Sequence, residues 1–367
     1  MHGAPGHRPA TRVVHAGLPP AGQGEPFLPG PTFAAPYHLA GPADASLYGY
    51  GRYANPTFTA YEAALGELEG GEVTLFASGM AAVAAVLLPL LRPGDVLVAP
   101  SDAYPGVRTI AAEYLEPRGV EVRLVPTDET ALREALPGAR LVWVETPSNP
   151  GLDVLDLQAL APDVHAAGAL LAVDNTLATP LLQRPLALGA DASVASGSKA
   201  LTGHSDLVLG HVAARDEQLV EDIRAWRNAT GAVPGPFETW LAHRSLATLD
   251  VRLRRACANA EALADLLRAR GDVGDVRWPG LGSVVCFDVG SPERAQAFLT
   301  ACELVAEATS FGGVHTSAER RARWGTDAVP GGFIRLSAGV EDIGDPAADL
   351  TRALDTATVR RSASPPT

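Results

Sequence analysis

The distribution of apolar and polar residues changes character at Glu72, where short apolar runs begin to alternate with stretches of helical periodicity. The runs predict strands at Val73–Phe76, Val96–Ala99, Val120–Val125, Leu141–Val144, Leu170–Val173 and Ala192–Ala195. The stretches between them predict helices at Met80–Leu91, Val107–Leu115, Glu129–Leu136 and Leu157–Ala167. Such alternation predicts an α/β fold, in which a large domain holds a mostly parallel sheet between helices.

The pattern shifts again after Pro236. Residues 238–270 read as one long charged helix, and strands at Val284–Val289 and Phe333–Ser337 flank a helix near Glu293–Cys302. This pattern predicts a smaller C-terminal α/β domain. The first 45 residues are rich in Gly, Pro and Ala and are expected to form an extended arm that another surface must order. The predicted division is therefore an arm over 1–45, a large domain over 46–236 and a small domain over 237–367, ending in a polar tail from Arg360.

Charge and cysteine content narrow the class of protein. The formal net charge of −13 argues against nucleic acid or an anionic membrane as a partner. Three scattered cysteines, Cys257, Cys286 and Cys302, are too few for a disulfide framework or a metal site. The sequence has neither a signal-peptide pattern nor an apolar stretch of membrane-spanning length. We therefore expect a cytoplasmic protein without a metal.

Lys199 is the single lysine among 29 basic residues, and the others are all arginines. Arginine and lysine serve equally well on most solvated surfaces. Arginine, however, stays protonated in proteins, whereas a lysine can lose its proton and form a Schiff base. The alternative explanation is that one lysine was retained by chance. The residues around Lys199 distinguish this explanation from a Schiff-base lysine.

Polar side chains that could bind a ligand follow three of the predicted strands. They lie at the carboxyl ends of these strands, where the binding residues of parallel sheets gather. Ser78-Gly79 turns the first strand into a helix, where free N–H groups could hold a phosphate, or where Ser78 could simply cap the helix. Asp174 ends another strand, where its carboxylate could face a ligand or could accept a hydrogen bond from the backbone of its own turn. Ser196 and Ser198 precede Lys199, which lies 25 residues after Asp174.

Together these groups match the needs of pyridoxal 5′-phosphate (PLP). The amine forms the imine, the hydroxyls and the glycine turn hold the phosphate, and a carboxylate beside the pyridine nitrogen keeps the ring protonated. Two other patterns carry less weight. His204, Ser205 and Asp206 are adjacent in sequence and cannot form a catalytic triad. A dinucleotide-binding motif requires a helix directly after its glycines, and no helical pattern follows Gly312-Gly313.

With these groups in place, the sequence resembles the Cys/Met-metabolism PLP enzymes, which include cystathionine γ-lyase, cystathionine γ-synthase and methionine γ-lyase. The resemblance runs from Thr11 to the helix near Leu350. It rests on Tyr50-Gly51-Arg52 with Asn55-Pro56-Thr57, Ser78-Gly79-Met80, Glu145 to Pro150, Val173 to Thr176, Pro185 to Asp191, Ser198-Lys199 with Gly203 to Asp206, and Ile334 to Ser337. The fold it implies is the fold-type-I architecture of PLP-dependent transferases.

The resemblance also implies a role for each matching residue. Lys199, Tyr104 and Asp174 would be catalytic: Lys199 as the Schiff-base lysine and proton shuttle, Asp174 beside the pyridine nitrogen, and Tyr104 stacked on the ring and able to protonate a leaving sulfur. Asn149, Ser310 and Arg335 would bind the substrate, with Arg335 forking onto the α-carboxylate. The cofactor-binding set would be Tyr50, Arg52, Ser78, Gly79, Met80, Tyr104, Asp174, Thr176, Ser196, Ser198 and Lys199. Purely structural roles remain as alternatives. Tyr104 could be an aromatic residue of the core, and Arg335 could pair with an acidic residue that has no part in binding.

Tyr50 and Arg52 would reach the phosphate of a neighbouring subunit, which implies a homo-oligomer, expected as a tetramer built from two dimers. Several positions depart from the family pattern: Gly51 replaces a usual Ser, and Thr309 and His315 stand where Glu is common. The segments between Gly280 and Val284 and after Ser317 are also shorter than usual. These last changes lie where the small domain shapes the substrate entrance, so they leave PLP binding in place and affect substrate choice.

Within the family, the turn from Gly231 to Pro236 and the presence of Gly106, where methionine γ-lyases carry Cys, favour cystathionine γ-lyase. That enzyme of transsulfuration splits cystathionine into cysteine, 2-oxobutanoate and ammonia. Cystathionine γ-synthase is the main alternative, and a PLP-fold protein that binds without turnover is a remote one.

Overall fold

The computed structural model describes residues 7–362, and for residues 43 and 359–362 it describes the backbone alone. The described residues divide into two compact units. The larger holds the residues up to Glu145 together with Leu155–Thr202 and Asp206–Asp250. The smaller holds Thr146–Val154, Gly203–Ser205 and the residues from Val251 onward. The predicted domain bounds, at residues 45 and 236, stay predictions.

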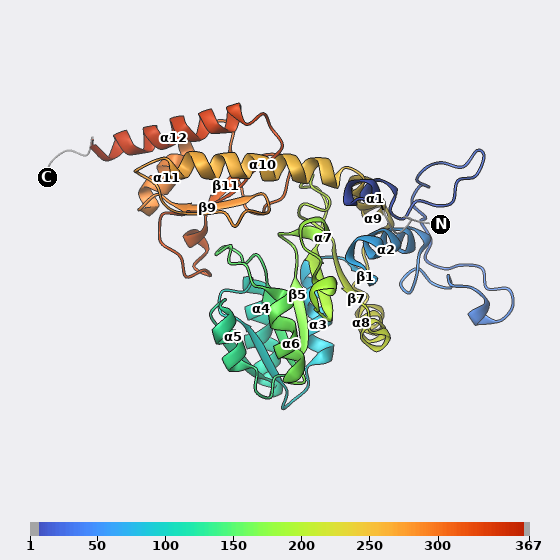
Figure 1. The fold of residues 1–367 in the computed structure, drawn as a ribbon. Coiled ribbons are helices and arrows are strands. Elements are labelled where there is room, and N and C mark those ends of the chain that lie inside the picture. The colour runs from blue at the N-terminus through green and yellow to red at the C-terminus, as the bar shows by residue number, and fades with distance from the viewer. Residues whose placement is uncertain (1–6, 363–367) are drawn as a thin grey trace. The chain divides into compact units, whose positions relative to one another are not determined.

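A seven-stranded sheet forms the centre of the larger unit (Figure 1). Its strands are β1 (Glu72–Phe76), β2 (Val96–Pro100), β3 (Glu121–Val125), β4 (Leu141–Glu145), β5 (Leu170–Asp174), β6 (Ala192–Ser196) and β7 (Gly210–Ala214). They lie in the order β1-β7-β6-β5-β4-β2-β3. Only β7 runs antiparallel to its neighbours, so the other six strands present their carboxyl ends at one edge. The prediction of a mostly parallel sheet is confirmed.

Helices cover both faces of this sheet, because successive residues of its buried strands point to opposite sides. Ala99, Trp143 and Ala172 pack in one apolar core, whereas Val98, Val142 and Val173 pack in another. The first core contains α3 (Gly79–Leu90), α4 (Pro105–Ile110) and α8 (Glu217–Thr230). The second contains α5 (Glu129–Ala135) and α6 (Leu157–Ala166). The fold-type-I architecture expected from the sequence is thereby confirmed.

The remaining helices of the larger unit are short or lie beside the sheet. They are α1 (Pro9–His15), α2 (Pro56–Glu69), α7 (Thr179–Leu182) and α9 (Pro236–Leu246). Single turns of 3-10 helix occur at Ala43–Ala45, Glu116–Arg118 and Pro185–Leu188, and a π-helical turn at Ala111–Leu115 extends α4. The chain between α1 and α2 forms long loops that extend away from the sheet, in blue in Figure 1.

The smaller unit contains a five-stranded sheet in the order β10-β11-β12-β9-β8. The strands are β8 (Gly274–Arg277), β9 (Val284–Asp288), β10 (Ala306–Glu307), β11 (Ser317–Arg320) and β12 (Phe333–Ser337). One face packs on the helices through an apolar core that includes Phe287, Ile334 and Leu336. Those helices are α10 (Leu249–Arg268), α11 (Pro292–Ala301) and α12 (Gly344–Ser362), with a 3-10 turn at Arg321–Trp324.

Three details differ from the prediction. The expected helix over 238–270 is two helices, because the chain turns at residues 247–248, where the backbone N–H of Thr248 bonds the carbonyl of Ser245 at 3.2 Å. Strands β7, β8, β10 and β11 had no clear period-2 signal and were not predicted. Residues 360–362, assigned to a polar tail, complete α12, and residues 363–367 lie outside the described chain.

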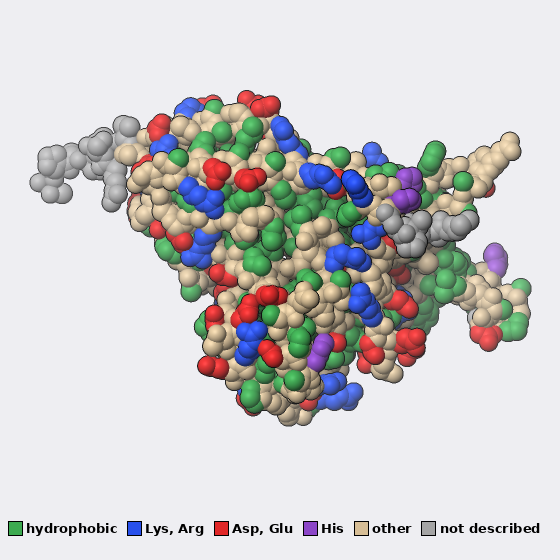
Figure 2. Space-filling model, in the orientation of Figure 1, with side chains coloured by type: hydrophobic (Ala, Val, Ile, Leu, Met, Phe, Trp, Pro, Cys, Tyr) green, Lys and Arg blue, Asp and Glu red, His purple; other side chains and the backbone are tan. Residues whose placement is uncertain are grey.

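The described surface mixes charges of both signs. Figure 2 shows acidic and basic side chains interspersed over the face in view, without a continuous basic stripe. Among residues 7–362, each helix is either too short or too polar to span a bilayer.

Candidate active site

All of the predicted cofactor residues except Tyr50 and Arg52 end or follow strands of the larger unit's sheet and gather at its carboxyl edge. Asp174 ends β5 and Ser196 ends β6, and these two strands are parallel neighbours. Residues 77–79 follow β1, and Tyr104 follows β2 at the same edge. Because parallel strands end together, this edge is where a ligand of such a sheet is expected.

The Ser78–Gly79 turn is pressed against the ends of two strands. A Cβ at Gly79 would lie 2.7 Å from Cβ of Ser196, and a Cβ at Gly210 of β7 would lie 2.3 Å from the carbonyl oxygen of Ser78. Both positions therefore require glycine. Ser78 also caps α3, since its Oγ accepts the N–H of Ala81 at 3.0 Å. The alternative prediction, that Ser78 is a helix cap, is therefore confirmed. The open N–H groups at the start of α3 remain suited to a phosphate.

Asp174 is half-buried, and the loss of solvent around its carboxylate raises its pKa. Hydrogen bonds from Thr176 and electrostatic attraction to His211 and Lys199 oppose that rise. Its Oδ1 accepts the backbone N–H of Thr176 at 3.0 Å, so this aspartate also bonds its own turn, as the alternative reading supposed. A carboxylate that burial makes costly to ionise is well placed beside a cation such as a protonated pyridine nitrogen.

Thr176 and Ser198 tie the turns around Lys199 together. The Oγ1 of Thr176 accepts the backbone N–H of Ser196 at 2.8 Å. The Oγ of Ser198 accepts the backbone N–H of Leu209 at 3.0 Å and donates to its carbonyl at 3.2 Å. Lys199 follows in a turn whose N–H bonds the carbonyl of Ser196 at 3.3 Å, and its side chain is half-buried. The structure therefore brings the lysine and both serines to one edge, although the phosphate role of Ser198 stays a prediction.

Tyr104 stands at the start of α4 with 43% of its surface exposed, so it is not a core aromatic. Its backbone N–H donates to Oε2 of the buried Glu145 at 3.2 Å. A Cβ at Gly106 would lie 2.5 Å from Sδ of Met80 and 3.1 Å from Cε1 of Tyr104, so Met80, Gly106 and Tyr104 pack closely. Glu145, which is the cross-strand partner of Asp174, and Gly210 were missed from the sequence, because a strand-end acid and a strand glycine both read as ordinary turn residues.

Tyr50 and Arg52 belong to the extended loops and contact their own chain. The Nη1 of Arg52 donates to the carbonyl of Asn228, and its Nη2 donates to Oη of Tyr53 at 3.1 Å. Gly51 has a local cause: a Cβ there would lie 2.4 Å from the carbonyl oxygen of Ala34. The serine that is usual at this position would therefore require the loop to move.

The three predicted substrate residues meet in the smaller unit. Arg335, in β12, donates from Nη1 to Oδ1 of Asn149 at 2.7 Å and from Nη2 to the carbonyl of Ser310 at 3.2 Å. It also forms a buried ion pair with Glu319. The alternative prediction, in which Arg335 pairs with an acidic residue of the protein, is therefore confirmed as a contact. The Nε of Arg335 is buried without a hydrogen-bond partner among the described residues. This guanidinium therefore has a donor to spare.

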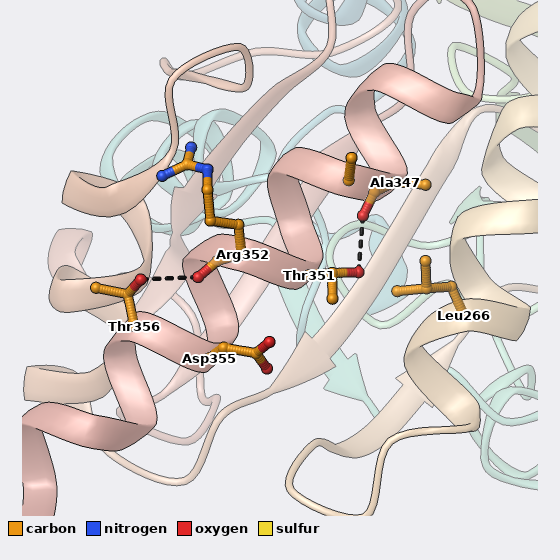
Figure 3. Close-up of a pocket in the computed structure, with 7 residues that line it drawn as sticks. Leu266, Ala347, Thr351, Arg352, Asp355 and Thr356 are labelled. Carbon is orange, nitrogen blue, oxygen red and sulfur yellow. Dashed lines mark hydrogen bonds between the residues drawn. The ribbon is translucent and has the colours of Figure 1, made fainter.

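One departure from the family pattern, Thr309, lies beside this group. Its Oγ1 donates to Oε1 of Glu319 at 3.4 Å, whereas His315 is exposed. A separate open groove between α10 and α12 carries no comparable chemistry (Figure 3). Its Thr351 and Thr356 hydroxyls bond carbonyls of their own helix at 2.8 Å each, and it contains none of the predicted site residues.

The larger unit fits PLP on the chemistry of its donors. It presents an amine that can deprotonate, a half-buried carboxylate and a glycine-formed helix start at one sheet edge. These are the three groups that the imine, the ring nitrogen and the phosphate call for.

The chain is similar to known proteins over most of its length. Residues 11–355 match the model of the Cys/Met metabolism PLP-dependent enzyme family. A Streptomyces coelicolor protein, provisionally named cystathionine gamma-lyase, is 53% identical, with 97% of this chain and 95% of that protein covered. A cystathionine gamma-synthase of Mycobacterium tuberculosis is 38% identical, with coverage of 94% and 96%.

Solved structures agree. A methionine gamma lyase from Micromonospora echinospora superimposes with a TM-score of 0.89 at 38% identity and covers 95% of this chain and 99% of its own. The same protein is named cystathionine gamma lyase in a second structure. The match over nearly the whole chain, together with the site geometry, shows that this protein belongs to the Cys/Met metabolism PLP-dependent enzyme family.

Proposed function

We propose that the protein is a cystathionine γ-lyase, which converts cystathionine and water to cysteine, 2-oxobutanoate and ammonia. The observation that carries the choice is Gly106, which has no room for a side chain unless Met80 moves. This disfavours the cysteine typical of methionine γ-lyases. The turn from Gly231 to Pro236, which resembles the lyase version of this turn, supports the same choice. It lies beside the site, since the carbonyl of Ala232 accepts the N–H of Ala77 at 3.1 Å, directly before the Ser78–Gly79 turn. The name of the Streptomyces relative supports it as well.

The proposed roles follow from the chemistry of each side chain. PLP, when bound, supplies an electron sink for negative charge at the substrate Cα. Lys199 removes the α-proton and helps to move a proton at Cβ, because its amine, unlike a guanidinium, can lose and regain a proton. Tyr104 protonates the leaving sulfur at Cγ. Asp174 stabilises positive charge on the ring nitrogen, and Arg335 binds the α-carboxylate with Asn149 beside it.

A substrate panel tests the reaction. Incubation with cystathionine should release 2-oxobutanoate faster than incubation with methionine does. Faster formation of cystathionine from cysteine and an activated homoserine would instead indicate γ-replacement. That second candidate is favoured by the mycobacterial synthase, which matches this chain over 94% of its length.

Arg335→Lys should raise KM for cystathionine by roughly ten- to a hundredfold, with a smaller change in kcat. The forked contact to the carboxylate becomes a point charge, which costs on the order of 1.5–3 kcal/mol for one charged hydrogen bond. Steady-state kinetics measure the effect. Arg268→Lys, an exposed arginine of α10 paired with Asp265, is the matched control and should keep the native KM. An unchanged KM in Arg335→Lys would place the carboxylate elsewhere.

We also propose that the enzyme is a homo-oligomer whose smallest competent unit is a dimer, with a tetramer as the expected assembly. The loops between α1 and α2 expose large apolar side chains: Phe27 is 89%, Phe33 73% and Leu47 69% exposed. Apolar surface of this kind is typical of an interface. Closed symmetry would give two reciprocal sites, with Tyr50 and Arg52 serving the neighbouring chain.

Complementation tests the shared site. Lys199→Ala and Arg52→Ala should each be nearly inactive alone, and mixed chains should regain part of the native activity. Hybrid dimers contain one site in which both residues are intact. Subunit exchange is checked with differently tagged chains. If exchange occurs and activity does not return, Arg52 serves its own chain.

A further inference from the structure

A row of polar side chains crosses the second face of the sheet in the smaller unit. Arg335 of β12 has Cys286 of β9 and Glu319 of β11 as its cross-strand partners. Residues opposite one another in antiparallel strands point to the same face, so this register sets the glutamate beside the guanidinium. All three side chains are buried. The pairing of Glu319 with Arg335 is thus fixed by strand register.

Glu319 receives hydrogen bonds at both carboxylate oxygens. Its Oε1 accepts from Nη2 of Arg335 and from Nη1 of Arg321, the latter at 2.8 Å. Its Oε2 accepts from Nε1 of Trp324 at 2.9 Å. Burial would raise the pKa of this carboxyl, but Arg335, Trp324 and Arg321 together hold it below its ordinary value. Glu319 is therefore an anion that cannot rotate without breaking contacts at both oxygens.

Arg321 is itself anchored. Its Nε and Nη2 donate to Oδ2 of Asp327 at 2.9 and 2.6 Å, and its side chain is 7% exposed. Two arginines thus alternate with two carboxylates in one buried chain of contacts. The second arginine and the second acid balance each other. Arg335 can consequently be oriented by Glu319 while the group as a whole keeps a charge near zero before an anionic ligand arrives.

Contacts at both terminal nitrogens fix the plane of the Arg335 guanidinium. Glu319 and the carbonyl of Ser310 bind Nη2, while Asn149 binds Nη1. A guanidinium recognises a carboxylate through two parallel N–H donors, so a rotation of its plane misaligns both bonds at once. A side chain that helps to fix this plane can therefore affect carboxylate binding without touching the carboxylate.

We propose that Glu319 is a positioning residue, which holds Arg335 in the orientation that binds the α-carboxylate of an amino-acid substrate, with Arg321 and Trp324 holding Glu319 in turn. This inference rests on the proposed role of Arg335. It adds that recognition of the carboxylate depends on a residue one strand away, in the segment 317–324.

Binding of two small amines to the PLP-loaded enzyme tests the proposal. Glycine carries the carboxylate, and methylamine is the same molecule without it. Glu319→Gln should weaken glycine binding by about tenfold to a hundredfold, the range that follows from the loss of a charged hydrogen bond, and should leave methylamine binding unchanged. Calorimetry measures both affinities without turnover. For cystathionine, KM should rise more than kcat falls.

Three further variants separate the explanations. Asp349→Asn is the matched control: this buried acid of the same unit bonds the backbone N–H groups of residues 303–305, and its change should alter neither affinity. Glu319→Asp keeps the charge one methylene further back, so glycine binding should weaken less than in Glu319→Gln. It carries the test if the glutamine variant does not fold. Arg335→Lys is measured alongside them.

Each outcome has one reading. If Arg335→Lys weakens glycine binding and a folded Glu319→Gln does not, Glu319 does not position Arg335. Equal weakening of glycine and methylamine by Glu319→Gln indicates general loosening and overturns the inference as well. If Arg335→Lys itself leaves glycine binding unchanged, the proposed carboxylate site fails first, and the role of Glu319 fails with it.

Discussion

Lys199→Arg should abolish turnover of cystathionine, although the substitution preserves a positive charge at nearly the same length. A guanidinium does not lose its proton in a protein, so it can neither attach PLP covalently nor carry the α-proton. Two measurements are decisive. Borohydride treatment followed by mass spectrometry should no longer link the cofactor to the chain, and 2-oxobutanoate release should fall to background.

The sequence itself offers a sharp control for this variant. Because Lys199 is the single lysine, a second change can return an amine to the protein at another place. Arg92→Lys alone, at an exposed loop position, should leave the kinetics native. Lys199→Arg combined with Arg92→Lys should stay inactive. Native absorbance and full activity in Lys199→Arg would refute the assignment of the lysine.

Asp174→Ala should leave a folded protein whose kcat is lower by roughly a hundred- to a thousandfold, the usual loss when one preorganised electrostatic partner is removed. The ring nitrogen loses the anion that keeps it protonated, and the electron sink weakens. PLP should also dissociate more readily, which equilibrium dialysis measures independently of turnover. Steady-state kinetics with cystathionine give kcat.

Asp191→Asn is the matched control for this loss. Asp191 contacts the other end of the same strand, where its Oδ2 accepts the N–H of Leu171 at 2.7 Å and meets Nε2 of His165 at 3.0 Å. A change of carboxylate to amide there perturbs β5 without reaching its carboxyl end. We expect nearly native kcat and cofactor affinity. A near-native rate in Asp174→Ala would mean that another group protonates the ring.

The strand ends were predictable because parallel strands obey two strong rules. Buried strands read as apolar runs, and their carboxyl ends meet at one edge, so Asp174 and Lys199 could be placed together from sequence alone. The family resemblance added Tyr104 and Arg335, which carry no local signal. At Ser78 and Asp174 the structural alternatives also proved correct: the first caps α3 and the second bonds its own turn.

The contacts of the smaller unit could not be predicted. Strand β11 reads Ser-Ala-Glu-Arg, with a single apolar residue, so neither the strand nor its register with β12 could be identified from pattern. Without that register, nothing pairs Glu319 with Arg335. The break between α9 and α10 was hidden for a similar reason, since residues 247–248 carry neither proline nor glycine.

The pairing of β1 with β7 bears on how the chain folds during synthesis. Strand β1 ends at Phe76, yet its partner begins only at Gly210, and it pairs with no other strand of the sheet. At a synthesis rate of about 5–20 residues per second, β1 waits on the order of ten seconds for its partner to emerge. During this interval an apolar strand has an open edge, which favours contact with chaperones or with other nascent chains. The Ser78–Gly79 turn, which packs against Gly210, is assembled only afterwards, so the turn proposed to bind the phosphate forms late in folding.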